Sequence, residues 1–128
     1  MIPKKKFFIK IAIDSPAAAG AGTLAKMISK NYNLHYLDTG KIYRYIAYIK
    51  IKFPNKFAPN FLKKKIKDLK IKNLQNKYLL SDKIGTEASI ISKNKNIRKL
   101  VYSFQHNFAY NPPKKYNGSC LDGRDITY

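Results

Sequence analysis

Apolar positions near the start of the chain follow first the pattern of a strand and then that of a helix. Phe7–Ile13 is apolar at nearly every position, which predicts a short buried strand. A loop of small residues, Asp14–Gly22, follows, and a helix is predicted from there to about Asn31. Its apolar face carries Leu24, Met27 and Ile28. His35–Leu37 predicts a second strand, so the order strand, loop, helix, strand indicates a parallel α/β sheet.

Helical periodicity dominates the middle of the chain. A helix is predicted over Lys41–Ile51, with an apolar stripe formed by Ile42, Ile46 and Ile49. The composition changes over Phe53–Lys77, where prolines and asparagines flank a Lys-rich segment, Phe61–Lys72. That segment keeps its own helical stripe of Leu62, Ile66 and Leu69. We interpret its lysines as a solvated helix face rather than as a binding patch.

Two helices and two short strands are predicted in the rest of the chain. Tyr78–Leu80 is interpreted as a short strand, and Ser81 or Asp82 as the cap of a helix that extends to Ser92. The next helix has one of the clearest patterns in the chain, with Ile97, Leu100, Val101, Phe104 and Phe108. Ser119–Leu121 indicates the start of another buried strand.

Length and composition favour one globular domain. The chain has 128 residues, of which 45% are hydrophobic and 13% aromatic, so it can form a packed core and is not intrinsically disordered. The single cysteine, Cys120, excludes an intramolecular disulfide and a cysteine-cluster metal site. No apolar run approaches the roughly 20 residues that span a bilayer, and no signal-peptide pattern is present. A cytoplasmic location is therefore expected.

The net charge of +19 points to nucleic acid or an anionic membrane, but the type of basic residue weakens that interpretation. Nearly all the positive charge is Lys, whereas proteins that read base edges and phosphates tend to use Arg. The three arginines are Arg44, Arg98 and Arg124. Abundant Lys, Asn, Ile, Tyr and Phe is also what an A+T-rich coding sequence produces. We favour this compositional explanation over nucleic-acid binding.

Asp14–Thr23 places small residues between a predicted strand and a predicted helix. Backbone N–H groups and the positive end of the helix dipole can bind an anion there, and small residues let a phosphate approach the backbone. In the phosphate-loop pattern G-x-x-x-x-G-K-[ST], Ser15 replaces the first Gly, Gly20 fits, and Ala21 replaces the Lys. For this motif alone, a tight strand–helix turn without a ligand is an equal alternative.

Two other polar motifs follow predicted strands, Leu37–Arg44 and Asp122–Asp125. Ligands of open α/β sheets bind at the carboxyl ends of the strands, so all three motifs should converge. The chain has only seven acidic residues, yet four lie at predicted strand ends: Asp14, Asp38, Asp122 and Asp125. The structural alternatives are a helix cap for Asp38 and a local ion pair between Arg124 and Asp125.

Together these motifs resemble the bacterial cytidylate (CMP/dCMP) kinase family. Ile11–Lys26, IAIDSPAAAGAGTLAK, is similar to the family opening I-A-I-D-G-P-[AS]-[GA]-[AS]-G-K-G-T, and LDTGKIYR is similar to L-D-[ST]-G-x-[MI]-Y-R. Gly85–Ser89 resembles the N-A-A-S segment, with Arg98 where the family has Arg, and LDGRD resembles A-D-G-R-D. The four motifs occur in order at compatible spacings and cover about Lys6 to Tyr128.

The resemblance implies a role for each matching residue. The ATP phosphates would be held by Ser15, Pro16, Ala17, Ala18, Ala19, Gly20, Ala21, Gly22 and Thr23. CMP would be bound by Thr39, Arg44, Ser89, Arg98, Arg124 and Asp125, of which the last two are the catalytic candidates. The chemistry agrees, because Arg forks suit a phosphate monoester. A Ser hydroxyl and an Arg–Asp pair can read the cytosine edge, where N4 donates and N3 and O2 accept.

The chain departs from the family pattern in two ways. Ala21 stands where a lysine would neutralise charge on the transferring phosphoryl group, and loss of one such preorganised group typically costs about 10²–10³ in rate. Lys41, where the family often has a small residue, is a candidate substitute. The chain also stops before the family's remaining strands, arginine-bearing lid and C-terminal helix, so we expect an N-terminal fragment.

The fold implied is α/β, a three-layer phosphate-loop kinase core with a parallel sheet and an inserted monophosphate-binding subdomain over about residues 53–80. The reaction implied converts ATP and CMP or dCMP into ADP and CDP or dCDP, with Mg²⁺ bridging the phosphates. The expected partners are these nucleotides, without a membrane or a specific nucleic acid, and a monomer is expected. Two alternatives stay open: a catalytically impaired nucleotide-binding fragment, and a Lys-rich nucleic-acid-binding protein whose affinity collapses with salt.

Overall fold

The computed structural model describes residues 8–14 and 21–123, and the chain divides into two compact units. The sheet unit comprises the residues up to 37 and those from 106 onwards, and the helical unit comprises residues 38–105. No helix among the described residues is long and apolar enough to cross a membrane.

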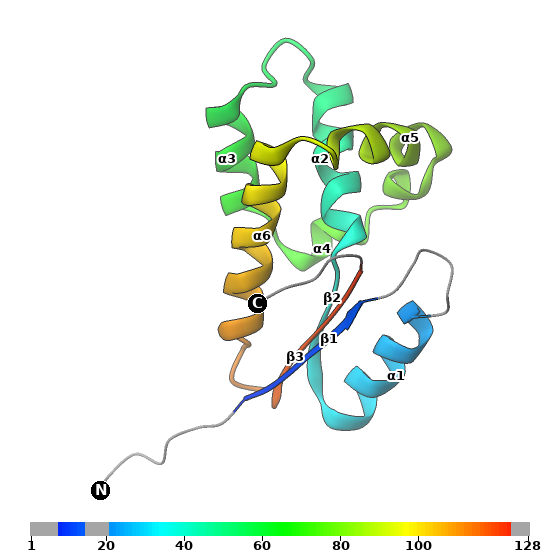
Figure 1. The fold of residues 1–128 in the computed structure, drawn as a ribbon, viewed down its shortest axis with the longest axis vertical. Coiled ribbons are helices and arrows are strands. Elements are labelled where there is room, and N and C mark those ends of the chain that lie inside the picture. The colour runs from blue at the N-terminus through cyan, green and yellow to red at the C-terminus, as the bar shows by residue number, and fades with distance from the viewer. Residues whose placement is uncertain (1–7, 15–20, 124–128) are drawn as a thin grey trace, which may run out of the picture. The chain divides into compact units, whose positions relative to one another are not determined.

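The sheet unit contains three strands in the order β1-β3-β2. Its elements are β1 (Ile9–Asp14), α1 (Ala21–Tyr32), β2 (Leu34–Asp38), the end of α6 (Lys95–Tyr110) and β3 (Gly118–Gly123) (Figure 1). β1 and β3 are parallel, although they are far apart in the sequence. The predicted α/β class is therefore confirmed, because parallel neighbours must be joined by a long crossover connection.

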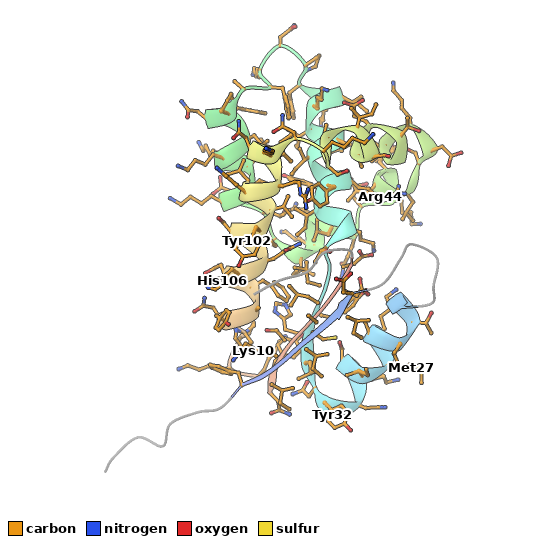
Figure 2. The ribbon with its side chains drawn as sticks, in the orientation of Figure 1. Lys10, Met27, Tyr32, Arg44, Tyr102 and His106 are labelled. Atoms are coloured by element: carbon orange, nitrogen blue, oxygen red, sulfur yellow. The ribbon has the colours of Figure 1, made fainter. Side chains whose placement is uncertain are left out.

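Helix α1 packs on the sheet through small side chains. Ala25 is fully buried in a cluster with Cys120, whose Sγ lies 3.8 Å from the Ala25 carbonyl oxygen, and Ile28 packs against this cluster. Leu24 and Met27 are 51% and 57% exposed. Figure 2 shows Met27 on the side of α1 that faces away from the sheet. The predicted apolar face was therefore wrong for two of its three residues, because so close a helix–strand contact has room for small residues only.

Strand β1 forms as predicted, but it is not deeply buried. It lies at the edge of the described sheet, with β3 as its neighbour, and Ile9, Lys10 and Ala12 are exposed. Ile11 and Ile13 pack against the cluster under α1. The prediction of a buried strand was wrong, because an apolar strand is buried on both faces only where other elements cover both.

Hydrogen bonds around Asn117 set the register of β3. The Asn117 side chain donates to the Tyr32 carbonyl (3.0 Å) and its backbone N–H donates to the Asn33 carbonyl (2.8 Å). Its own carbonyl accepts from the Ile9 N–H at 3.0 Å. At the next residue, Gly118, a Cβ would lie 1.9 Å from the Ile9 carbonyl oxygen. Only glycine therefore fits where β3 begins beside β1.

The helical unit contains α2 (Gly40–Lys52), α3 (Pro59–Lys67), α4 (Ile71–Leu74), the 3₁₀ helix η1 (Lys77–Leu80), α5 (Asp82–Ile91) and the first part of α6 (Figure 1). Its core includes the predicted apolar positions Ile42, Ile46, Ile49, Leu62, Ile66, Leu69, Ile97 and Val101. Helix α5 begins as predicted, because the Ser81 hydroxyl accepts a hydrogen bond from the Ile84 N–H (3.3 Å).

Two local predictions in this unit were wrong. Helix α3 ends at Lys67, earlier than the apolar stripe indicated, and a separate short helix follows it. Tyr78–Leu80 belongs to a 3₁₀ helix and not to a strand. The Asn76 side chain accepts a hydrogen bond from the first N–H of that segment (3.0 Å), which starts a helical turn, and only Leu79 of the three residues is buried.

Candidate functional site

The predicted phosphate loop lies partly within the described residues. Ser15–Gly20 lies outside them, whereas Ala21 opens helix α1 and Gly22 and Thr23 lie in its first turn. Strand β1 ends just before the loop, at Asp14. Strand β1 and the N-terminus of α1 therefore flank residues 15–20, in the strand-then-helix order that anion binding at a helix N-terminus requires.

Asp122, near the end of β3, lies beside this helix N-terminus. The residue is almost fully buried, and its Oδ2 accepts a hydrogen bond of 2.5 Å from the Tyr36 hydroxyl. The same oxygen is 3.8 Å from the position that a Cβ on Gly22 would occupy. A carboxylate in this place can bind a cation that accompanies a phosphate at the start of α1.

The sheet register brings the ends of two predicted motifs together. Asp14, the last residue of β1, is the Cα partner of Gly123, which directly precedes Arg124. The strand ends at which the first and third motifs begin therefore lie side by side, as the predicted convergence requires. The predicted catalytic pair, Arg124 and Asp125, lies outside the described residues.

The Leu37–Arg44 motif forms the start of α2. The Asp38 Oδ1 accepts a hydrogen bond from the Gly40 N–H (3.1 Å), so it satisfies a donor at the helix start, as the structural alternative for this residue expects. Thr39, a predicted CMP residue, is buried at the N-cap position. Lys41, the candidate substitute for the loop lysine, is half-buried in the first turn.

Arg44 extends from α2 to the junction between η1 and α5 (Figure 2). Its Nη1 donates to the Leu79 carbonyl at 2.7 Å and to the Ser81 carbonyl at 3.4 Å. The Nε and Nη2 groups make no hydrogen bond to the described residues. One edge of the guanidinium is thus anchored, and the other has the donor geometry that suits a phosphate.

Ser89 and Arg98, the other predicted CMP residues of the helical unit, are both exposed. Ser89 lies on α5 one helical turn after Gly85, against which the Arg44 guanidinium packs. Ser89 therefore lies on the side of α5 against which the Arg44 guanidinium packs. Arg98 lies on α6, a different helix.

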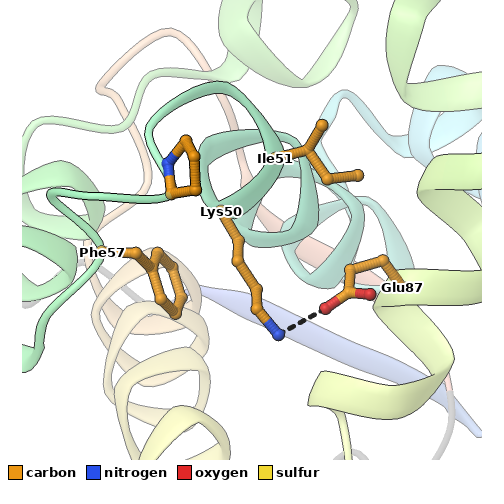
Figure 3. A pocket seen from close by; sticks show the side chains of 5 residues that line it. Lys50, Ile51, Phe57 and Glu87 are labelled. Atoms are coloured by element: carbon orange, nitrogen blue, oxygen red, sulfur yellow. Dashed lines mark hydrogen bonds and ion pairs between the residues drawn. The ribbon is translucent and has the colours of Figure 1, made fainter.

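A cavity of about 390 Å³ in the helical unit is lined by Lys50, Ile51, Pro54, Phe57 and Glu87 (Figure 3). Lys50 Nζ and Glu87 Oε1 form an ion pair at 2.6 Å on its wall. None of the predicted nucleotide-binding residues that the structure describes lines this cavity.

Three described side chains have clearly shifted pKa values, and none is a predicted nucleotide-binding residue. Burial and the nearby Lys115 lower the pKa of His35. Burial raises the pKa of the Cys120 thiol, which therefore stays neutral, and burial also raises the pKa of Tyr45. The sequence prediction assigned no role to Tyr36 or Gly85, whose contacts only the structure shows. Two signals pointed to Gly85: it begins the segment that resembles N-A-A-S, and it is a glycine inside a helical pattern.

The family model described as cytidylate kinase matches residues 11–128 of the chain. The cytidylate kinase of Bartonella tribocorum is 44% identical over 119 residues, an alignment that covers 91% of this chain and 53% of the relative. The cytidylate kinase of Rhodospirillum rubrum is 37% identical over 119 residues and is covered over 55% of its length. The chain spans about half the length of the curated relatives it matches.

The match includes most of strand β1, the start of α1, the Arg44 region and the end of β3. Because the sequence match extends over nearly its whole length, the chain belongs to the cytidylate kinase family.

Proposed function

We propose that this chain is the part of a cytidylate kinase that binds the phosphates of ATP and the acceptor CMP or dCMP. Family membership supports the proposal, and the observation that carries it is the arrangement at the sheet edge. There β1 leads toward the N-terminus of α1, and Asp122 lies beside that helix's first turn. Residues 1–128 are then an incomplete kinase domain, in which the segment 53–80 is the inserted part that helps to bind the monophosphate.

On the ATP side, residues Ser15–Thr23 would surround the phosphates with backbone N–H groups, and the dipole of α1 would favour the negative charge. Small side chains throughout this segment allow the close approach that such binding needs. The position of Gly22 and Thr23 in the first turn of α1 supports this assignment.

Mg²⁺ bound with ATP would neutralise part of the phosphate charge. The described residues contain no group of three His, Cys, Asp or Glu side chains that could hold a metal ion. Mg²⁺ in phosphoryl-transfer sites needs only one or two carboxylates besides phosphate and water oxygens. Asp122, with the Thr23 hydroxyl on the adjacent helix turn, fits that requirement. Tyr36 would keep the Asp122 carboxylate oriented.

On the CMP side, Thr39, Arg44, Ser89, Arg98, Arg124 and Asp125 would bind the acceptor. A CMP phosphate oxygen attacks the γ-phosphorus of ATP, and the bond from that phosphorus to the β–γ bridging oxygen breaks, which releases ADP. The attacking oxygen is already anionic, so no strong protein base is needed. Arginine side chains, including Arg124 at the catalytic position, would stabilise the charge on the transferring group.

Titration calorimetry with CMP, UMP and AMP tests the proposal at moderate salt. CMP should bind more tightly than the other two, because the serine and the Arg–Asp pair match the cytosine edge. Equal affinity for the three nucleotides would contradict cytosine recognition. Binding that ignores the base and collapses as salt rises would instead support the nucleic-acid alternative.

A further inference from the structure

Gly85 occupies a position where its backbone has no need of glycine. It lies inside helix α5, which runs from Asp82 to Ile91, and it does not have a positive φ. In a helix interior Gly is the least favourable residue after Pro, because it loses the most backbone freedom on folding. The reason for a glycine here must therefore lie in the space around it.

That space is occupied by the end of Arg44. A Cβ on Gly85 would lie 3.0 Å from Nη2 and 3.3 Å from both Cζ and Nη1 of Arg44. Apart from the helix's own backbone and the adjacent residues, these are the three nearest atoms to that position, so the guanidinium packs directly against the helix at Gly85. A methyl group would push it away by a few tenths of an ångström.

The guanidinium cannot move away without cost, because hydrogen bonds hold it on one edge. Nη1 donates to the carbonyls of Leu79 and Ser81, at the junction where η1 ends and α5 begins. Nη2, the atom nearest to the missing Cβ, belongs to the edge that has no partner among the described residues. Displacement by a side chain at residue 85 would therefore move this edge of the guanidinium.

We propose that Gly85 is a positioning residue that orients the Arg44 guanidinium toward the phosphate monoester of the acceptor nucleotide. The inference rests on the proposed function, in which Arg44 binds that phosphate. Glycine lowers the stability of the helix at this position, but it leaves the space in which the guanidinium packs. Ser89, one turn further along α5, would then lie close to the same ligand.

The test compares Gly85→Ala and Gly85→Leu with Thr86→Ala, an exposed control on the same helix. CMP and cytidine are titrated into the full chain, and thermal unfolding is followed by circular dichroism. Gly85→Ala should unfold at the same or a higher temperature, because Ala is the better helix former. It should nevertheless weaken CMP binding about tenfold and change cytidine binding by less than about twofold, because charged hydrogen bonds depend strongly on geometry. Gly85→Leu should weaken CMP further, and Thr86→Ala should change neither ligand.

A double-mutant cycle separates positioning of Arg44 from a general effect on the helix. In an Arg44→Ala background, Gly85→Ala should no longer affect CMP binding, because the group that it displaces is absent. If Gly85→Ala weakens CMP equally in both backgrounds, or not at all in the parent, the positioning role is wrong while the proposed function stands. If the unmodified chain binds CMP no better than cytidine, the assignment of Arg44 to the phosphate is wrong, and the inference fails with it.

Discussion

At the level of single residues, Asp122 and Tyr36 form a close side-chain hydrogen bond inside the sheet unit. Asp122 is almost completely removed from solvent, and the 2.5 Å hydrogen bond from Tyr36 provides a partner for its carboxylate. An ionised group in such a place is stable only while its hydrogen bonds are kept. Tyr36 is therefore expected to matter for stability as well as for orientation of the carboxylate.

Tyr36→Phe should lower the free energy of unfolding by about 1.5–3 kcal/mol, the usual contribution of a hydrogen bond to a charged group. The ring and its packing against the α1 cluster are kept, so the loss reports on the hydroxyl alone. Urea denaturation measures it. Tyr32→Phe is the matched control, because Tyr32 is 58% exposed, and equal losses for both variants would contradict the assignment.

The lowered pKa of His35 predicts that the free energy of unfolding depends on pH. Its ring stacks on Phe108 and Tyr116 with centroid distances of 4.2 and 4.8 Å, and its buried Nδ1 has no hydrogen-bond partner among the described residues. Burial and Lys115 lower its pKa below the ordinary 6.5, so the unfolded chain takes up a proton at a higher pH than the folded chain. The free energy of unfolding should therefore fall as the pH drops through 6.5, until the folded pKa is reached.

His35→Phe isolates this contribution. The variant keeps an aromatic ring for the stack but removes the titrating group, so the decrease in stability near pH 6 should become smaller. Urea denaturation at several pH values between neutral and mildly acidic gives the slope. His106→Phe serves as the control, because His106 is exposed. An unchanged slope in His35→Phe would show that other groups cause the pH dependence.

Helix α1 shows how a single element can be predicted correctly while its buried face is not. The helix extends over Ala21–Tyr32, close to the expected range. Ala25, which packs against Cys120, and Ser29 are buried, and the Ser29 hydroxyl donates within the helix to the Ala25 carbonyl at 2.7 Å. Large apolar residues define a face by periodicity, whereas close packing on a strand depends on small ones.

Ala25→Leu should therefore destabilise the chain by about 1–3 kcal/mol, because the larger side chain cannot fit against Cys120. Met27→Ala should change stability by less than about 0.5 kcal/mol, although the sequence pattern placed Met27 on the apolar face. Thermal or urea unfolding of both variants measures the difference. If Met27→Ala proves the more costly change, the helix packs on the sheet through the opposite face.

A substitution at Ala21 is expected to change catalysis rather than stability. Ala21→Lys in the complete protein should raise kcat by about 10²-fold if no other residue compensates, because the missing charge acts mainly on the transferring phosphoryl group. The ATP KM should change less. Lys41→Ala is the companion variant: if Lys41 compensates, it removes most activity and Ala21→Lys adds little. Steady-state kinetics of both single variants and the double variant distinguish these cases, and no effect on kcat in any of them would contradict the loop assignment.

Charge is the dominant property of the whole molecule. The net charge is +19, and Lys50–Glu87 is an ion pair with both side chains partly exposed. Pairs of this kind contribute little, whereas the unbalanced lysines repel one another in the folded state more than in the expanded unfolded state. Repulsion of this kind is reduced by salt, because the screening length is about 10 Å at 0.1 M ionic strength.

Raising NaCl from low concentration to about 0.15 M should therefore increase the melting temperature of the chain. Differential scanning fluorimetry at constant pH measures this shift. A control with the same ionic strength from KCl separates screening from binding of a specific cation. A melting temperature that falls with salt would mean that attractive ion pairs outweigh the repulsion.

The sequence by itself determined the order of the elements and most of the helical core. Ile42, Ile46 and Ile49 recur at helical spacing and are all buried, because a regular stripe has one way to be covered. The Ser81 cap was predicted from residue type, since the interaction is local. Family membership was also predicted from four motifs in order, and the family match over residues 11–128 confirmed it.

Only the tertiary structure decided the contacts between residues far apart in the sequence. Tyr36 meets Asp122 across 86 positions, and Arg44 meets the Leu79 carbonyl across 35. The partial exposure of β1 and the burial of Ala25 depend likewise on which element lies alongside. Periodicity shows at which spacing apolar residues recur along the chain, but not which residues of other elements they contact. The space beside Gly85 is filled by a guanidinium from another helix, a contact that no sequence pattern reveals.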